Sequence, residues 1–132
     1  MVSADPVADL LVSLKNAGAV GHRSVTTPFS NLRLAVAEAL RRAGFVKNIV
    51  KKGKKVKKYL ELELIYAPDG RARLQTVKKV SRSSRRVYRG FPVIYPVRQG
   101  SGVAIYSTPR GVLTGEEAKK ERVGGELLAE VW

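Results

Sequence analysis

The sequence predicts an α+β fold of two small units. Residues 1–67 are expected to form an N-terminal αβαββ unit, and residues 68–132 a C-terminal unit of mostly antiparallel β-structure with one short helix. Amphipathic helical stripes alternate with strand-like segments in the first part, and short strands bounded by turn residues fill the second. Pro68-Asp69-Gly70, a turn signal, is the predicted hinge. The 132 residues, 44% of them hydrophobic, are enough for a core.

The first unit begins with a predicted helix. Asp5-Pro6 supplies an N-cap followed by proline, and Gly18 is expected to end the helix. Residues 21–27 suit a short strand. Ser30 is the cap of a second helix that is expected to stop at Gly44. The two apolar stripes at helical spacing are Val7, Leu10, Leu11 and Leu14, then Leu32, Val36, Ala39, Leu40 and Ala43.

A hairpin is expected to complete this unit. Residues 45–50 and 59–67 read as strands joined by a lysine-rich turn around Gly53. Leucines alternate with Glu61 and Glu63, which predicts one buried and one solvated face. We interpret the two glutamates as partners of lysines across the strands and not as a catalytic pair.

The second unit is expected to contain several short strands. Proline at residues 92 and 96 makes residues 91–97 an irregular or edge segment. Thr114 and Glu117 have capping-box spacing, which predicts a short helix to about Arg122. The other strand-like segments are 71–80, 86–89, 103–107 and 126–132.

The charge of the chain points to a polyanionic partner. There are 25 Lys and Arg against 11 Asp and Glu, a net charge of +14. Such a charge favours nucleic acid first and an anionic membrane second. Residues 70–115 contain ten basic and no acidic residues, interleaved with aromatic residues that either stack on bases or fill a core. The aromatic residues are Tyr88, Phe91, Tyr95 and Tyr106, and the expected electrostatic RNA contacts are Lys51, Lys52, Lys54, Lys55, Lys78, Lys79 and Arg82.

No reaction is indicated by the sequence. The chain has no cysteine and one histidine, His22, which we expect to be exposed, so zinc sites built from these ligands are excluded. Gly53-Lys54 lacks the rest of a P-loop, and Gly100-Ser101-Gly102 lacks the third glycine of a dinucleotide fingerprint. We therefore expect no cofactor, no metal and no catalysis. With no apolar run of roughly 18 residues and no signal peptide at residues 1–5, we expect a soluble cytoplasmic protein that does not bind a membrane.

Residues 107–111 are the clearest candidate contact. Ser107 and Thr108 provide hydroxyl groups beside Arg110, and Gly111 permits close approach of a backbone. Such groups can bind bases, phosphates and 2′-hydroxyls. Equally, hydroxyls at a strand end can satisfy the backbone of their own turn.

Motifs along the whole chain resemble one family. Residues 103–108, 111–114 and 123–127 closely resemble the C-terminal signature of bacterial ribosomal protein eight of the small subunit. Residues 5–11 look like that family's opening helix, and Pro28, Ser30, Leu32 and Arg33 match the start of its second helix. The resemblance implies direct binding to the central domain of small-subunit ribosomal RNA, a part in early assembly, and no catalysis.

The same resemblance implies positions for the RNA contacts. The RNA-contact loop of the family falls on Ser107, Thr108 and Gly111. The chain departs from the family pattern at three places: Pro109 replaces a serine, Ser83-Ser84 replace Pro-Gly, and Asn31 replaces a lysine. Pro109 has no N–H, which removes one potential donor. The remaining expected contacts are Tyr88, Arg85, Arg86, Arg110, Ser30, Arg33, Gly124, Gly125 and Glu126.

Other functions are left open by the sequence. The apolar residues of 91–97 are a candidate surface for neighbouring ribosomal proteins, among them protein five. The resemblance also implies a possible repressor role on the chain's own messenger RNA. A small basic nuclease is a third class, for which no catalytic residues are assembled.

Overall fold

The computed structural model of the chain describes residues 5–82 and 84–132. It confirms the α+β class, with two compact units formed by Met1–Gln75 and Thr76–Trp132. This division follows residue 75, whereas the sequence predicted a division after residue 67. The intervening segment bonds back to the first unit, since Tyr66 pairs with Ala72 and the Arg73 N–H donates to the Ile65 carbonyl at 2.8 Å. The prediction about a signal peptide concerns residues 1–5, of which only the last is described.

Two helices form one layer of the first unit. Helix α1 spans Pro6–Val20 and is capped by Asp5, whose carboxylate accepts from the Ala8 N–H at 3.0 Å. It continues past Gly18, the predicted end, to Gly21 at φ +82°. Gly18 serves packing instead, because a Cβ there would lie 2.8 Å from the Ala72 Cβ. Helix α2 spans Asn31–Arg42 and is followed by Gly44 at φ +84°, as predicted.

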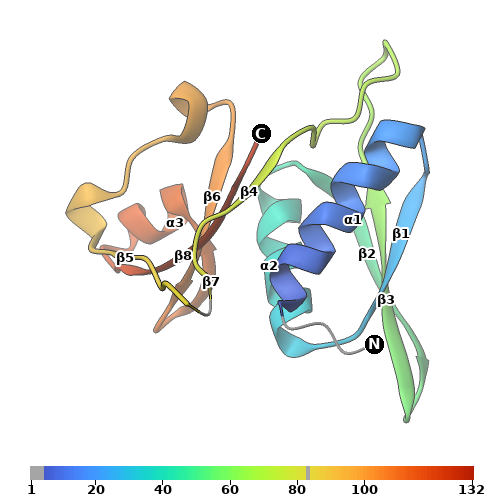
Figure 1. Ribbon diagram of the computed structural model, residues 1–132, viewed down its shortest axis with the longest axis horizontal. Coiled ribbons are helices and arrows are strands. Elements are labelled where there is room, and N and C mark those ends of the chain that lie inside the picture. The colour runs from blue at the N-terminus through green and yellow to red at the C-terminus, as the bar shows by residue number, and fades with distance from the viewer. Residues whose placement is uncertain (1–4, 83) are drawn as a thin grey trace. The chain divides into compact units, whose positions relative to one another are not determined.

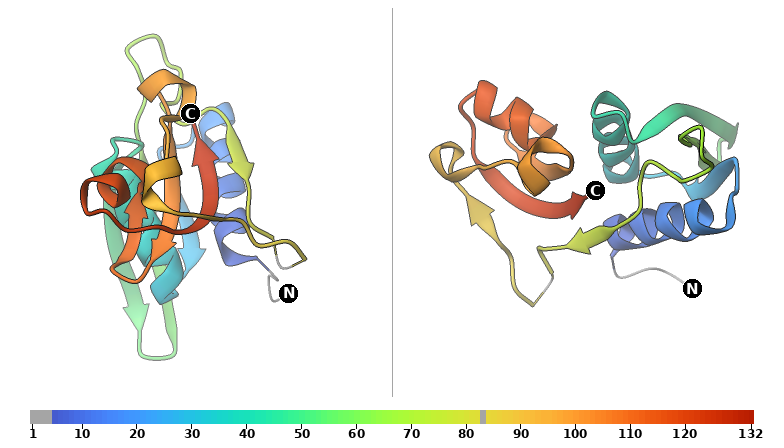
Figure 2. Two further views of the ribbon diagram at one scale, coloured as in Figure 1. Left: turned by 90° about the vertical axis from the view of Figure 1, so that its left-hand side faces the viewer. Right: turned by 90° about the horizontal axis from the view of Figure 1, so that it is seen from above.

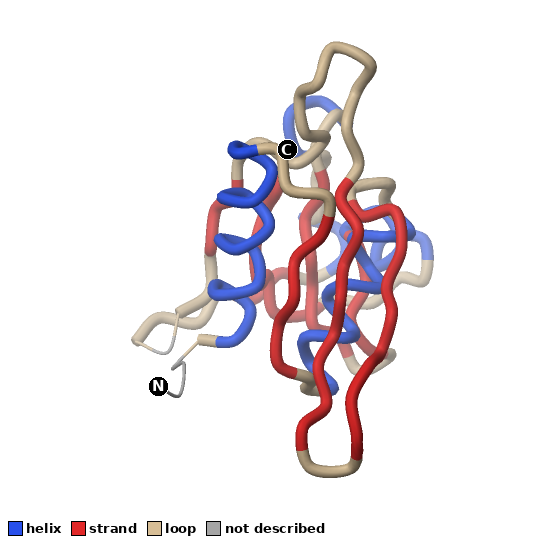
Figure 3. Tube along the Cα trace, turned by 90° about the vertical axis from the view of Figure 1, so that its right-hand side faces the viewer, coloured by secondary structure: helices blue, strands red, loops and turns tan. Residues whose placement is uncertain are grey.

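The second layer of this unit is a three-stranded antiparallel sheet. Its strands are β1 (Ser24–Pro28), β2 (Val46–Lys54) and β3 (Lys57–Leu64), in the order β1-β3-β2. The helices cover one face (Figure 1), where Leu60 and Leu62 are fully buried. The other face is open, and the β2–β3 hairpin extends beyond β1 at the bottom of Figure 3.

The turn of this hairpin lies at Lys55–Val56 and not around Gly53 as predicted. Gly53 is the second-last residue of β2, at φ +99°. A Cβ there would lie 2.1 Å from the Lys57 carbonyl oxygen. Glycine is therefore needed for the close approach of the two strands, which the sequence pattern for turns does not distinguish.

The second unit is a five-stranded sheet with one α-helix. A curved central strand, β8 (Gly125–Val131), pairs with three others, all antiparallel (Figure 2). The main strand order is β4-β8-β6-β7, and β5 also pairs with β8. The remaining elements are β4 (Val77–Lys79), β5 (Tyr88–Arg89), 3₁₀ helices at Phe91–Val93 and Val97–Gly100, β6 (Val103–Thr108), β7 (Gly111–Thr114) and α3 (Gly115–Lys120).

Several predictions for this unit are confirmed and others are corrected. The irregular segment, the strands at 103–107 and 126–132, and the capped helix are present. The predicted strand at 71–80 is wrong outside 77–79, since Arg71 and Arg73 bond to residues of the preceding loop. The strand at 86–89 is reduced to its last two residues, and β7 was not predicted.

Tyr106 lies at the centre of the core of the second unit and is fully buried. It packs with Leu127 of β8, Ala118 of α3 and Ile94 of the irregular segment. This core fixes β6 against β8, and several candidate contact residues of this unit lie on and beside these two strands.

Candidate nucleic-acid interface

The β6–β7 turn carries the hydroxyl groups that the sequence singled out. The Thr108 hydroxyl donates to the Gly111 carbonyl oxygen at 2.7 Å and accepts from the Arg110 N–H at 3.1 Å. Gly111 has φ +103°, and Pro109 is exposed in the turn. Of the two roles considered for the Thr108 hydroxyl, the turn-building one is observed. One lone pair of its oxygen remains for an external donor.

Ser107 belongs to a row of side chains that crosses three strands. Ser107 of β6 is paired with Glu126 of β8, and Glu126 is paired with Tyr88 of β5. Directly opposed residues of antiparallel strands point to the same face of a sheet. Tyr106 and Leu127, one position along, pair on the opposite face and enter the core. We call Tyr88, Glu126 and Ser107 the polar row.

The polar row combines groups that suit RNA. The Tyr88 side chain is exposed, with 69% of the residue accessible, so its ring is free to stack on a base. The Ser107 hydroxyl has no hydrogen-bond partner among the described residues, and it is half-buried. Glu126 accepts a hydrogen bond from Arg86 Nη1 at 3.1 Å. The carboxylate that lies between Tyr88 and Ser107 in the row therefore holds the Arg86 guanidinium.

Gly124 and Gly125 hold the strands of the row close together. A Cβ at Gly125 would lie 2.2 Å from the Ser107 carbonyl oxygen, and one at Gly124 would lie 2.5 Å from the Arg89 carbonyl oxygen. Real Cβ atoms do not approach backbone oxygens so closely. The structure thus gives these two glycines a packing role beside the row.

Further basic residues of the second unit lie in the segment between β4 and β5, on β4 and in the β6–β7 turn. Arg82 and Arg85 exchange backbone hydrogen bonds at 2.9 and 3.0 Å, and both side chains are exposed. Lys78 is exposed on β4, whereas the Lys79 ammonium donates to the Ser81 carbonyl. Arg110, in the β6–β7 turn, lies 4.0 Å from Glu121. Of the departure at residues 83 and 84, residue 83 lies outside the described residues, and residue 84 is exposed.

Ser30 and Arg33 belong to the first unit. The Ser30 hydroxyl accepts from the Arg33 N–H at 3.0 Å, so Ser30 is the N-cap of α2. Asn31, the first residue of this helix, is exposed. The RNA contacts expected at Ser30 and Arg33 stay predictions.

The expected lysine contacts lie on the β2–β3 hairpin. Lys51, Lys52, Lys54 and Lys55 are all exposed. Lys52 pairs with Glu61 at 3.0 Å, and Lys47 and Arg23 approach Glu63 at 3.7 and 3.8 Å. The interpretation of the two glutamates as cross-strand partners is confirmed.

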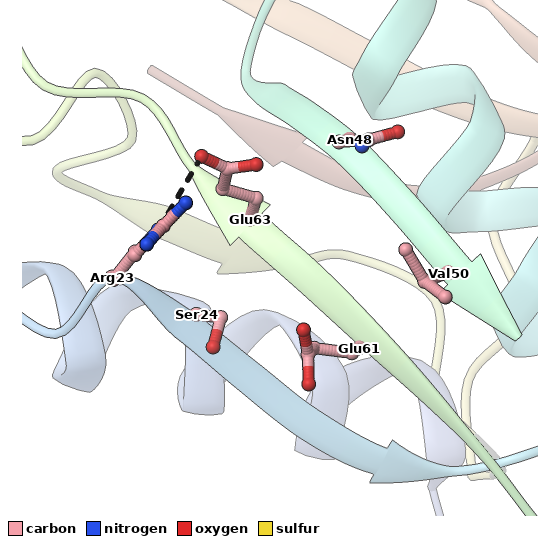
Figure 4. A pocket seen from close by; sticks show the side chains of 6 residues that line it. All are labelled: Arg23, Ser24, Asn48, Val50, Glu61 and Glu63. Carbon is pink, nitrogen blue, oxygen red and sulfur yellow. Dashed lines mark ion pairs between the residues drawn. The ribbon is translucent and has the colours of Figure 1, made fainter. Parts of the chain in front are cut away.

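A hollow of about 340 Å³ lies on the open face of the same sheet (Figure 4). Glu61, Glu63, Arg23 and Asn48 are among its lining residues, and the figure shows Arg23 directed toward Glu63. No group of three or more His, Cys, Asp or Glu residues suited to a metal ion occurs within the described part of the chain. His22 is exposed, as predicted. Each glutamate of the hollow is already paired with basic residues, Glu61 with Lys52 and Glu63 with Arg23 and Lys47.

The sequence reasoning missed the cation–π contacts, of which two lie near expected RNA contacts. The Arg89 guanidinium lies 4.6 Å from the Tyr95 ring centroid, and the Lys51 ammonium lies 4.4 Å from that of Phe29. The partners are six and 22 positions apart, respectively, so no helix or strand spacing rule indicates either pair. Tyr88, Phe91 and Tyr95 are exposed, whereas Tyr106 is part of the core.

Tyr106 is the one tyrosine of the described residues with a clearly shifted pKa. Burial raises the pKa of its phenol, and the nearby Arg89 guanidinium opposes that rise. The phenol is therefore neutral at physiological pH and acts in packing. None of the described helices is long and apolar enough to cross a membrane.

The fold and the charged surface together define a small basic α+β protein. The family model described as Ribosomal protein S8 matches residues 5–132. The chain belongs to this ribosomal protein family.

Curated relatives cover the whole chain. A protein of Roseiflexus castenholzii is 41% identical over 128 residues, 97% of each chain. Proteins of Bifidobacterium adolescentis and Streptococcus pneumoniae are 38% and 39% identical over 132 residues, 100% of each chain. All three are named small ribosomal subunit protein uS8. Family membership makes the chain a structural constituent of the small ribosomal subunit, located with the ribosome in the cytoplasm.

Proposed function

We propose that this protein binds the central domain of small-subunit ribosomal RNA directly and helps its assembly, without catalysis. The polar row carries the proposal, because one sheet face presents an exposed aromatic ring, a hydroxyl without a hydrogen-bond partner among the described residues, and a carboxylate that holds a guanidinium. Sequence-specific RNA recognition uses such groups at loops and distorted pairings, since regular A-form helices hide their base edges.

RNA binding then has two contributions, one from non-specific contacts and one from specific contacts. Lysines and arginines attract phosphates of any sequence in a salt-dependent way. The polar row and the β6–β7 turn recognise an irregular RNA shape. The two contributions are separable by mutation, because they lie on different side chains.

The separation predicts different effects for two substitutions. Ser107→Ala removes a hydroxyl that no described residue uses as a hydrogen-bond partner. It should weaken binding to cognate RNA by up to roughly tenfold, which corresponds to the loss of one hydrogen bond. Lys54→Ala should weaken all RNAs alike and lower the slope of log K against log salt by about 1 at most. Binding is measured by titration of a central-domain fragment and of a random duplex of equal length. Thr108→Ala should also lose cognate preference, through loss of the turn bonds.

The wild type decides the proposal in the same titration. Tight binding to the central-domain fragment that survives the random competitor and moderate salt is the expected result. Equal, salt-labile binding to both RNAs would contradict a specific rRNA-binding function. A messenger RNA with the same shape as the ribosomal site would bind through the same residues. The leader of the protein's own messenger RNA is therefore a third RNA to include in this titration.

A second candidate function is docking of a neighbouring ribosomal protein, protein five being the one expected. Its supporting observation is that three apolar or aromatic residues at alternate positions are exposed: Phe91, Val93 and Tyr95, with 37%, 56% and 56% of their surface accessible. An apolar protein contact should persist after ribonuclease treatment and in high salt, whereas an RNA-mediated one should not. Co-purification with and without ribonuclease distinguishes the two.

A further inference from the structure

The outer end of the β2–β3 hairpin carries lysines on both of its faces. Lys51 is opposite Leu60, and Lys58 lies two residues before it, so both lysines share the face of the buried leucines. Lys54 and Lys57 oppose each other on the other face. Among the described residues, none of these four ammonium groups is in an ion pair, whereas Lys52 is paired with Glu61. We call these four residues the two-faced lysine ribbon.

Phe29 organises the first face of the ribbon. The ammonium groups of Lys51 and Lys58 lie 4.4 and 6.0 Å from the centroid of its ring. The Phe29 N–H also donates to the Lys58 carbonyl oxygen at 3.1 Å, which fixes the ring beside the hairpin. Cation–π attraction thus holds two positive charges near each other where no carboxylate compensates them.

On the second face, like charges of the two strands repel each other. Like charges directly opposed on neighbouring strands destabilise a hairpin, and Lys54 faces Lys57 with Lys55 next to them in the turn. Gly53 keeps the two strands close, since any Cβ there would meet the Lys57 carbonyl oxygen. The free protein carries this unfavourable arrangement, and a polyanion on this face would relieve it.

We propose that the two-faced lysine ribbon lies between two RNA backbones and binds phosphates on both sides. Lys51 and Lys58 contact one backbone, and Lys54 and Lys57 contact the other. If RNA contacted only one face, the two lysines of the other face would stay in solvent without an ion-pair partner among the described residues. The two backbones belong to two adjacent RNA helices, because the major groove of a regular A-form helix is too narrow to admit a two-stranded hairpin. This inference rests on the proposed RNA-binding function.

The test compares three double variants of the full-length protein. Lys51→Gln with Lys58→Gln neutralises one face, and Lys54→Gln with Lys57→Gln neutralises the other. Lys119→Gln with Lys120→Gln, on exposed positions of α3, removes the same charge elsewhere. The salt dependence of binding is measured for an isolated duplex and for a central-domain fragment in which helices adjoin. On the fragment, each face should lower the salt slope by about 1.4–1.8, and a further variant that combines all four lysine substitutions by about twice that, while the α3 control lowers it by less.

The outcomes separate this proposal from the proposed function. Loss from both faces on the fragment, with loss from at most one face on the isolated duplex, is the expected result. Equal loss from both faces on the isolated duplex overturns the arrangement between two helices. Loss from a single face on both RNAs, or a loss equal to that of the α3 control, overturns the proposal. Unchanged RNA binding with lost binding to anionic phosphatidylserine vesicles also overturns it. Preference for the fragment over random RNA reports the proposed function separately, and the ribbon variants should leave that ratio unchanged.

Discussion

At Gly125 the backbones of β6 and β8 approach so closely that no side chain fits. The Ser107 carbonyl oxygen is 2.2 Å from where a Cβ would lie, and the Thr108 Cγ2 is 3.0 Å from it. These neighbours are the residues of the proposed RNA contact. The glycine therefore links the stability of the sheet to the geometry of the interface.

Gly125→Ala should lower the free energy of unfolding by about 1–3 kcal/mol, because the strands must separate to admit the methyl group. The same substitution should also weaken binding to cognate RNA more than binding to random RNA. Urea unfolding and RNA titration measure the two effects. Gly90→Ala is the matched control, since its Cβ would meet only the Pro92 Cδ, at 3.6 Å. A Gly125→Ala protein as stable as this control would contradict the packing role.

The Tyr106 phenol gives the stability a pH dependence. Burial raises its pKa in the folded protein above the ordinary value of about 10. The unfolded chain then loses this proton at lower pH than the folded one, so stability falls as the pH rises above about 10. Tyr106→Phe should remove that part of the fall, as measured by urea unfolding at pH 8 to 11, about the range on either side of the ordinary tyrosine value. Tyr88→Phe, which changes an exposed phenol, should follow the wild-type curve.

Helix α3 is a short element that depends on its cap. It spans six residues, and the Thr114 hydroxyl accepts from the Glu117 N–H at 3.2 Å while the Glu117 carboxylate accepts from the Thr114 N–H at 2.9 Å. So short a helix has little stability of its own. It holds Ala118 in the core against Tyr106.

Thr114→Ala should therefore cost about 0.5–2 kcal/mol of unfolding free energy, the usual loss at an N-cap. Thr114→Ser keeps the hydroxyl and should restore most of it. Thermal and urea unfolding give the comparison. Equal losses in the two variants would show that the methyl group, and not the cap, stabilises the helix.

Elements with local signals were predictable, and elements that depend on distant partners were not. The capping residues Asp5, Ser30 and Thr114 act on N–H groups three residues away, so the sequence contains the whole interaction. Gly18 looked like a helix end, but it serves contact with Ala72, 54 positions later. The short strand β7 has no alternating pattern of its own and exists because β6 pairs with it.

At the scale of the whole molecule, the net charge of +14 acts on folding and on binding with opposite signs. Mutual repulsion of the cations destabilises the free folded protein, and phosphates attract the same charges. Raising salt from low to moderate concentration should increase the melting temperature of the free protein while it weakens RNA binding. Melting curves and RNA titrations over one salt series test this. A melting temperature that falls over the same series would contradict the repulsion.

The sequence by itself determined the three α-helices with their caps, most of the strands, the excess of positive charge and the family. These depend on residues near one another in the chain or on totals over all of it. Tertiary structure alone decided that Ser107, Glu126 and Tyr88 form one row, that Gly125 permits it, and that lysines occupy both faces of one hairpin. Strand register brings these residues together, and register is set by pairing between segments far apart in the sequence.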